Sequence, residues 1–243
     1  MVRFHGEPPT HLTIDALDAA GVCHAFTTRH HGNAAGKGEA SPALRTLGLD
    51  PRAVRFARQV HGNQCLVADG LPPGPIGEGD AIVTANPGTP LAVFTADCLA
   101  VIVADPERRA FGVAHAGWRG TIAGILGRLL DALVARFQVR PDRLVAGIGP
   151  SIGPCCYEVD EPVVGPLRAA FPGEWERWTR PRGPGKWSLD LWHANADQLV
   201  RGGVRSDAIA NPRLCTACRG DLFFSYRREG RGGSLAAFAA LGR

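Results

Sequence analysis

The sequence predicts one domain of the α+β class, in which strands and helices share a core. Between residues 90 and 120, two apolar runs separated by Asp-Pro and a charged Glu-Arg-Arg segment predict two strands joined by a short turn. Residues 122–137 repeat apolar side chains at steps of three and four, which predicts an amphipathic helix with one buried face. No repeat, linker or low-complexity segment divides the 243 residues, so residues 1–243 are expected to form a single domain.

The other segments are justified by the same patterns. Alternating or continuous apolar runs predict strands, and helical spacing predicts helices, at 11–28 (a short helix, then a strand), 54–68 (a strand), 80–84 (a strand), 144–148 (a strand), 161–171 (a helix), 189–202 (a helix) and 221–241 (a strand, a basic loop, then an apolar strand or helix). Stretches rich in glycine, proline and polar residues predict loops at 29–43, 69–80 and 172–187.

Composition limits the expected partners and cellular compartment of the protein. The net charge is +4, from 27 basic and 23 acidic residues that are spread along the chain, which does not favour a nucleic-acid partner. We find no apolar signal-peptide region and no run of about 18 apolar residues, so neither secretion nor a membrane is expected. The seven cysteines are odd in number and two are adjacent, which argues against a disulfide framework and favours a reducing cytoplasm.

Polar, metal-capable side chains interrupt three apolar segments. Cys98 lies in the first run near residue 90, His115 lies in the second, and His61 lies in the strand predicted at 54–68. Imidazole and thiolate are zinc ligands, and catalytic zinc sites keep three protein ligands with one open position. The spacing alone is a weak signal, because each histidine is also typical of an ordinary hydrogen-bonded side chain. Asp97, beside Cys98, either orients a ligand histidine or caps a strand end.

Other polar residues offer weaker signals. Arg119 is expected at a helix start, where backbone N–H groups favour an anion. Ser151 lies in a Gly- and Pro-rich turn that is either an anion-binding nest or a plain tight turn. Cys215 and Cys218 have CxxC spacing without a second pair, so a redox or zinc-knuckle role is the less favoured interpretation. The adjacent Cys155 and Cys156 do not have a spacing that requires a metal. The adjacent histidines at 30–31 are expected to be solvated.

Four segments together resemble a known family. They are QVHG at 59–62, TADC at 95–98 with GVAHAGWRGT at 112–121, GIGPSIGPCCYEV at 147–159, and the region from CT at 215 to FFSYRREG at 223–230. The family was described first as multicopper polyphenol oxidoreductases or laccase-domain proteins, and later as zinc-dependent purine nucleoside phosphorylases with adenosine deaminase activity. The resemblance implies one zinc ion bound by His61, Cys98 and His115, which would also be the catalytic residues.

The resemblance carries further expectations. It implies a single catalytic domain, a complex layered sandwich with mixed β-sheets flanked by helices. Its substrates would be adenosine, inosine or methylthioadenosine, which phosphate converts to the free base and ribose 1-phosphate. Arg119, Ser151 and Arg227 are candidates for binding phosphate, since Arg suits bidentate contact with that anion. Family members usually carry TRxGGxS near the N-terminus, whereas here Thr28-Arg29 precedes His-His-Gly and the segment is shortened; Arg29 remains a candidate substrate contact.

Three rival functions follow from the same residues. A Cys/His amide hydrolase would use Cys98 as nucleophile and His115 as base, and some relatives are linked to removing L-Ser from peptidoglycan precursors. Copper-dependent phenol oxidation fits the ligand types, so copper is an alternative metal, but the chain has few histidines for several coppers. A zinc-stabilised binding module would need a fourth ligand, and none is evident. No obligate protein partner is evident either.

Overall fold

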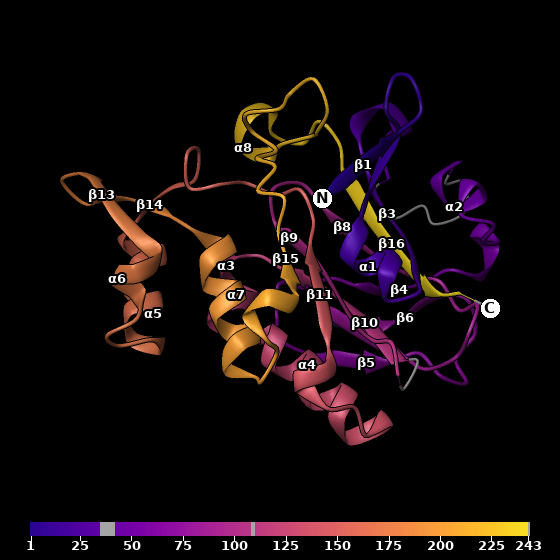
Figure 1. Ribbon diagram of the computed structural model, residues 1–243. Helices are drawn as coiled ribbons and strands as arrows, with labels where there is room; N and C mark the ends of the chain where they lie inside the picture. The colour runs from indigo at the N-terminus through magenta and orange to yellow at the C-terminus, as the bar shows by residue number, and fades with distance from the viewer. Residues whose placement is uncertain (35–41, 108–109, 243) are drawn as a thin grey trace.

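The computed structural model describes residues 1–34, 42–107 and 110–242 (Figure 1). Three sheets organise these residues, and most neighbouring strands run antiparallel. The seven-stranded sheet contains, in spatial order, β1 (Val2–His5), β2 (His11–Ile14), β3 (Val22–Thr27), β16 (Leu235–Leu241), β8 (Leu91–Thr95), β4 (Arg55–Arg58) and β6 (Gly74–Glu78). The six-stranded sheet contains β15 (Ile209–Ala210), β11 (Val145–Ile148), β9 (Leu99–Asp105), β10 (Ala110–Ala116), β7 (Ala81–Thr84) and β5 (Cys65–Val67). The small sheet contains β12 (Glu158–Asp160), β14 (Lys186–Leu189) and β13 (Thr179–Gly183).

Helices cover the six-stranded sheet and connect the strands. The α-helices in the described residues are α1 (Asp15–Ala19), α2 (Pro42–Thr46), α3 (Trp118–Ile122), α4 (Ile125–Phe137), α5 (Glu161–Ala170), α6 (Trp175–Trp178), α7 (Leu191–Arg201) and α8 (Tyr226–Glu229). Short 3₁₀ turns are η1 (Arg29–His31), η3 (Pro51–Ala53), η4 (Pro141–Arg143) and η5 (Ser206–Ala208). In the described ranges, none of these helices is long and apolar enough to cross a membrane.

The six-stranded sheet is buried on both faces. Along β9, Val101 and Val103 pack into the cluster formed with α4, α5 and α7, whereas Ile102 packs into the cluster shared with the seven-stranded sheet. A strand covered on both sides needs apolar residues at every position, which explains the unbroken apolar run seen in the sequence. The result is a layered α+β sandwich of mixed sheets flanked by helices, and this part of the fold prediction is confirmed.

One glycine lets the main helix lie close to the central sheet. A Cβ atom at Gly112 on β10 would lie 2.5 Å from Leu129 Cδ1 on α4 and 2.8 Å from Val83 Cγ1 on β7. Any larger side chain at Gly112 would therefore push α4 away from β10. This contact holds the helix that follows His115 in its position over the strand.

The segment between residues 90 and 120 differs from the prediction in one respect. It forms three strands and not two, because the first apolar run is divided into β8 and β9, which belong to different sheets. The chain crosses between the sheets at residues 96–98, and Asp97 adopts a left-handed conformation with φ of 90°. The crossing places Cys98 at the junction of the two sheets, which periodicity alone did not indicate.

Several element boundaries were also wrong. The helix predicted at 122–137 starts only at Ile125, because Gly124, with φ of 76°, separates it from α3, which ends at Ile122. The predicted loops contain regular structure: β6 lies within 69–80, and α6, β13 and the start of β14 lie within 172–187. The segment 11–28 begins with β2 before its helix, and part of the loop predicted at 29–43 lies outside the described residues.

Candidate metal centre

Three predicted ligands lie together at the junction of the two large sheets. The ligand atoms of His61, Cys98 and His115 all lie within 4.8 Å of one another. The two imidazole rings are nearly perpendicular, with centroids 4.7 Å apart and an interplanar angle of 85°. Two nitrogens and one sulfur at this separation suit a single Zn²⁺ ion, which binds imidazole at about 2.0–2.1 Å and thiolate at about 2.3 Å.

Each ligand is held by a different local structure, although all three were predicted to lie on strands. Only His115 does so, near the end of β10. Cys98 lies in the crossing between β8 and β9. His61 lies in the turn between β4 and β5, with φ of 59°, a conformation that is uncommon for a residue other than glycine. The strand predicted at 54–68 is therefore two short strands with the histidine between them.

Asp80, the residue before β7, organises the centre. Its carboxylate is fully buried and accepts hydrogen bonds from the backbone N–H groups of Val60 (3.2 Å), His61 (3.0 Å) and Gly62 (2.7 Å). The same carboxylate lies 2.8 Å from Nδ1 of His115. Because the protonated Nδ1 of His115 donates to Asp80, the Nε2 atom of the same imidazole remains available to a metal ion or a thiol.

Asp97 was one of two alternatives for this orienting role in the prediction from the sequence, but Asp80 makes the contact with His115. Asp97 instead accepts hydrogen bonds from Thr216 Oγ1 (2.6 Å) and from the backbone N–H of Arg227 (2.7 Å). It therefore ties the Cys98 crossing to the C-terminal segment. A lone acid at the start of the buried run 80–84 is the only signal in the sequence that pointed to Asp80.

The charges of the centre are coupled. Burial alone would raise the pKa of the Cys98 thiol, but hydrogen bonds from His115 and His61 lower it to about 6. Burial alone would lower the pKa of His115, but its hydrogen bonds with Asp80 and Cys98 raise it to about 9. Burial also opposes ionisation of Asp80, yet its bonds with His115 and Gly62 hold its pKa below the usual range. The metal-free centre at neutral pH is thus a thiolate beside an imidazolium.

Gly117 provides the space beside Cys98. A Cβ atom at this position would lie 2.8 Å from Cys98 Sγ and 3.3 Å from Cδ2 of His61. The glycine of the HAGWRG motif is therefore required by close approach to two of the three ligands. Thr121 then anchors α3, because it bonds with Asn195 on α7 (3.0 Å from Nδ2 to Oγ1).

A pocket of about 360 Å³ adjoins the start of α3. It is lined by Trp118, Tyr157, Glu158, Val159, Asp160, Val163, Lys186 and Arg227. The guanidinium of Arg227 lies 5.1 Å above the Tyr157 ring and donates to the carbonyl of Glu158 (2.8 Å). Burial, with the nearby Cys98 thiolate, raises the pKa of Tyr157 and keeps its hydroxyl protonated. Tyr157 lies in the GPCCYEV motif, but the sequence did not predict it as a site residue.

The residues predicted to bind substrate lie in different environments. Arg119 is exposed, and its guanidinium stacks 4.2 Å from the Trp118 ring centroid, at the edge of the pocket. Ser151 is fully buried, where Trp192 Nε1 donates to its hydroxyl (2.7 Å). Arg29 pairs with Glu229 (2.9 Å) and stacks on Phe224. These placements favour Arg119 and Arg227 as anion contacts. Ser151 and Arg29 do not line the pocket, and their polar groups already bind Trp192 and Glu229.

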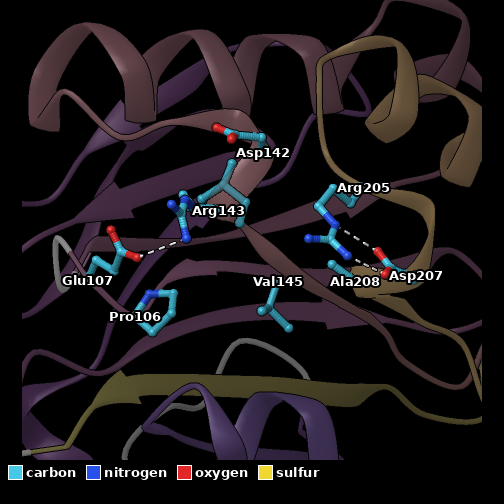
Figure 2. A pocket seen from close by; sticks show the side chains of 9 residues that line it. Pro106, Glu107, Asp142, Arg143, Val145, Arg205, Asp207 and Ala208 are labelled. Atoms are coloured by element: carbon cyan, nitrogen blue, oxygen red, sulfur yellow. Dashed lines mark hydrogen bonds and ion pairs between the residues drawn. The ribbon is translucent and has the colours of Figure 1, made fainter.

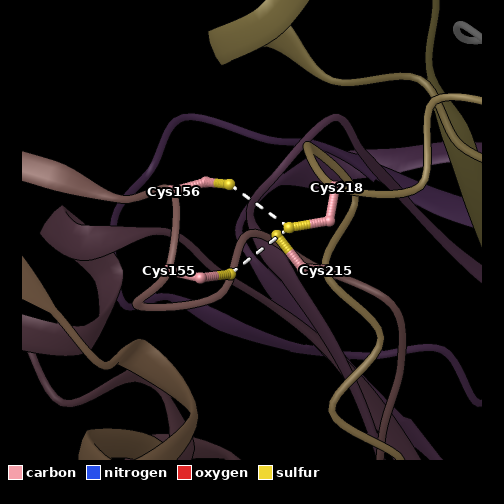
Figure 3. Close-up of side chains that lie close together, drawn as sticks. All are labelled: Cys155, Cys156, Cys215 and Cys218. Atoms are coloured by element: carbon pink, nitrogen blue, oxygen red, sulfur yellow. Dashed lines mark hydrogen bonds between the residues drawn. The ribbon is translucent and has the colours of Figure 1, made fainter.

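A second set of cysteines also comes together, which corrects the expectation that the CxxC segment lacks a second pair. We call it the four-cysteine cluster, and it consists of Cys155, Cys156, Cys215 and Cys218 (Figure 3). All four sulfur atoms lie within 4.8 Å of one another. The CxxC segment therefore has a partner pair, in the turn after β11, that lies about 60 residues earlier in the chain.

A further cavity lies away from the metal centre, between residues 106–107, 142–145 and 205–208 (Figure 2). Its volume is about 310 Å³. Its two arginines are each paired with an acid: Arg143 with Glu107 at 3.3 Å, and Arg205 with Asp207. Because both guanidinium charges are compensated, this cavity is less suited to an anionic substrate than the pocket at Arg227.

The fold and the site together define a layered α+β protein with a candidate metal centre of one cysteine and two histidines. Residues 33–242 match the family described as multi-copper polyphenol oxidoreductase laccase. The chain belongs to this family.

Relatives and solved structures agree with that assignment. A purine nucleoside phosphorylase of Deinococcus radiodurans is 41% identical over 243 aligned residues, covering 91% of this chain and 90% of that protein. Purine nucleoside phosphorylase YlmD of Geobacillus stearothermophilus is 41% identical over 160 residues, or 65% of this chain, and the alignment spans 58% of that protein. The crystal structure of YlmD superposes with a TM-score of 0.88 at 31% identity, covering 99% of each chain. The structure of YfiH from Bacillus licheniformis has a TM-score of 0.88 at 28% identity, covering 98% of each chain.

Proposed function

We propose that this chain is a zinc-dependent purine nucleoside phosphorylase that also deaminates adenosine. The observation that carries the proposal is the convergence of His61, Cys98 and His115 on one point beside the pocket that contains Arg227. The names of the relatives support the substrate class, since the proteins from Deinococcus and Geobacillus are both called purine nucleoside phosphorylases.

The residues fit a zinc ion. The donor set contains one soft thiolate and two imidazoles, and Asp80 holds His115 with Nε2 directed away from the carboxylate. In the described residues the group has three members, which corresponds to catalytic zinc sites with one open position. Copper also accepts this donor set, so the metal has to be measured. Bound zinc would supply Lewis acidity and a water molecule of lowered pKa at the open position.

The chain's own residues would bind and orient the substrates. The aromatic rings of Trp118 and Tyr157 can pack against a purine, and Arg119 and Arg227 provide cations for phosphate at the same end of α3. In phosphorolysis, a phosphate oxygen forms a bond to C1′ of the ribose, and the bond from C1′ to the base nitrogen breaks. The base leaves with the electron pair and takes up the proton that the attacking hydrogen phosphate gives up, and the protonated hydroxyl of Tyr157 is suited to hydrogen-bond to the base.

Deamination would occur at the same centre. An oxygen from water bonds to C6 of adenosine, and the amino group leaves as ammonia to give inosine. Adenosine, inosine and methylthioadenosine are the proposed phosphorolysis substrates. The seven cysteines are all unpaired in the structure, which favours a reducing compartment, and we propose a cytoplasmic enzyme.

A product assay tests the proposal. Purified protein with its metal content measured is incubated with adenosine, with and without phosphate, and the products are separated. Adenine and ribose 1-phosphate that form only with phosphate, or inosine under either condition, support the proposal. Cys98→Ala should lose zinc at this centre and both activities. Cys23 is a half-buried residue on β3 of the seven-stranded sheet, and Cys23→Ala should keep the zinc and both activities. A fully active Cys98→Ala protein would contradict the assignment.

A second candidate function follows from Asp80, His115 and Cys98, which form a carboxylate–imidazole–thiolate series. This order is that of Cys/His amide hydrolases, in which the thiolate attacks a carbonyl carbon and the imidazolium protonates the leaving amine. The substrate class would be an L-Ser-containing peptidoglycan precursor. Hydrolysis of such an amide by metal-free protein, stopped by alkylation of Cys98, would favour this function over nucleoside chemistry.

A further inference from the structure

The four-cysteine cluster is formed by two turns that follow β11 and β15, which are far apart in the sequence. Parallel pairing of β11 with β15 aligns Gly147 with Ala210, and an isolated parallel bridge, shifted in register by one residue, pairs Ser151 with Cys215. The bridge consists of hydrogen bonds from Ser151 N to Leu214 O and from Thr216 N to Ser151 O, each 3.1 Å long. The positions of the two cysteine turns are therefore fixed by the sheet and do not depend on any bond between sulfurs.

The separation of the sulfur atoms corresponds to a shared metal ion. Cys218 Sγ lies 3.5 Å from Cys155 Sγ and 3.4 Å from Cys156 Sγ, and all four sulfurs lie within 4.8 Å (Figure 3). Tetrahedral coordination with zinc–sulfur bonds of about 2.3 Å places neighbouring sulfurs roughly 3.8 Å apart. A disulfide requires about 2.05 Å, and the cysteines are unbonded.

One of the four sulfur atoms has a backbone donor beside it, whereas burial raises the pKa of the Cys155 and Cys156 thiols. The backbone N–H of Gly153 donates to Cys215 Sγ at 3.3 Å, a contact that stabilises negative charge on sulfur. Arg228 donates to the carbonyls of Thr216 (2.8 Å) and Ala217 (3.1 Å), which lie between the two cysteines of the CxxC segment. The two hydrogen bonds from Arg228 hold this turn in one conformation.

We propose that the four-cysteine cluster binds one zinc ion, at a structural site separate from the catalytic centre. Four soft thiolates favour zinc over magnesium or calcium, and four protein ligands close the coordination sphere. An iron–sulfur cluster would spread the thiolates over two or more irons, whereas here all four sulfurs lie within 4.8 Å of one another. The site contrasts with the three-donor centre at Cys98, which leaves a position open.

The site braces the catalytic centre. Thr216 lies between Cys215 and Cys218, and its hydroxyl donates to Asp97 beside the ligand Cys98. On the other turn, the N–H of Ile152 donates to the carbonyl of Asp97 at 2.9 Å. One ion that joins the two turns would thus hold Asp97 from both sides. The inference concerns metal binding by the four cysteines and does not depend on the proposed nucleoside chemistry.

Metal counting tests the proposal. Protein expressed with added zinc and purified under reducing conditions is analysed by inductively coupled plasma mass spectrometry. We expect two zinc ions per chain in the wild type, one in Cys98→Ala, one in Cys218→Ser, and none in the double variant. Cys23→Ser is the matched control and should keep both ions, because its sulfur belongs to neither group. A wild type with one zinc that Cys98→Ala loses completely would overturn the proposal.

Cobalt substitution gives a readout that does not depend on activity. In the Cys98→Ala background, Co²⁺ at the four-cysteine cluster should give intense thiolate-to-metal charge-transfer absorption, and the added substitution Cys218→Ser or Cys155→Ser should lose most of it. Both substituted side chains are exposed, so circular dichroism should confirm that these variants fold. Absence of the absorption in Cys98→Ala, or a disulfide within the cluster in freshly purified protein, would overturn the proposal.

Discussion

The Asp80 carboxylate and the His115 imidazole lie 2.8 Å apart, with 0% and 3% of their side chains exposed. This contact joins the loop that carries His61 to the strand that carries His115, because the same carboxylate accepts the N–H of His61. A fully buried carboxylate is costly unless several donors bind it, and Asp80 has four of them. The geometry of the candidate metal centre therefore depends on a residue that would not itself bind the metal.

Asp80→Asn should weaken metal binding at the centre about 10–100-fold, as loss of an outer partner of a ligand histidine typically does. The amide cannot accept as strongly from His115 and the backbone N–H groups. Zinc affinity measured by competition with a chromophoric chelator checks this. Asp131→Asn, an exposed residue on α4, is the control and should be unchanged. Equal affinities in the two variants would contradict the role of Asp80.

Gly117→Ala should lower metal occupancy at the Cys98 centre by at least about tenfold, because the new methyl group would lie 2.8 Å from Cys98 Sγ and force the sulfur to move. Gly127→Ala on α4 is the matched control, since no atom lies within 4 Å of its Cβ position. The control should be neutral or stabilise the helix by about 0.5–1 kcal/mol. Metal content and thermal unfolding of both variants provide the measurements, and normal occupancy in Gly117→Ala would refute the argument.

Cys98 should react as a thiolate in the metal-free protein. Its pKa of about 6 predicts that alkylation by iodoacetamide rises as the pH increases through about 6 and is nearly constant above pH 7. Burial raises the pKa of Cys65 to about 12, so that residue is an internal control that should stay unmodified at these pH values. Peptide-resolved mass spectrometry measures both rates. His115→Gln should move the inflection for Cys98 upward, and an inflection near pH 9 in the unaltered protein would disprove the coupling.

Arg119→Ala should raise the KM for phosphate roughly tenfold or more while changing kcat less, since a hydrogen bond to a charged group contributes about 1.5–3 kcal/mol. The exposed Arg119 guanidinium stacks on Trp118, which lines the pocket. Arg128→Ala removes an exposed arginine on α4 and should leave the KM unchanged. Steady-state kinetics at varied phosphate compares the two, and an unaltered KM in Arg119→Ala would remove this residue from the phosphate site.

Acid should destabilise the seven-stranded sheet through His24. The N–H of Ile14 donates to Nε2 of His24 (2.8 Å), so this buried imidazole must be neutral, and burial lowers its pKa from 6.5. The unfolded chain then binds more protons, so this contribution to stability is complete above pH 6.5 and is lost as the pH falls further.

The variant His24→Gln should lose about 1 kcal/mol of stability at pH 7.5, the typical net contribution of one hydrogen bond. Its stability should also fall less between pH 7.5 and 5.5 than that of the wild type. Urea unfolding at both pH values measures the difference. Identical slopes in the wild type and His24→Gln would show that His24 does not contribute.

Prediction from the sequence succeeded where the signal was local. The stripe of apolar residues along α4 and the unbroken apolar run of β9 and β10 follow from burial of one helix face and of both strand faces, and both were recognised as elements. The break of the helix at Gly124 and the division of β8 from β9 were missed, because a left-handed residue does not change the pattern of apolar residues.

By itself, the sequence determined the class of fold and the residue types of the candidate centre, because periodicity and the motifs around His61, Cys98 and His115 are properties of neighbouring residues. The structure brings these three together. Only the tertiary structure decided that Asp80 orients His115, that Ser151 is enclosed by Trp192, and that the two cysteine pairs form one cluster. These relationships join segments that lie 35 to 63 residues apart. Strand pairing and the crossing between sheets create them, and neither leaves a fixed spacing in the sequence.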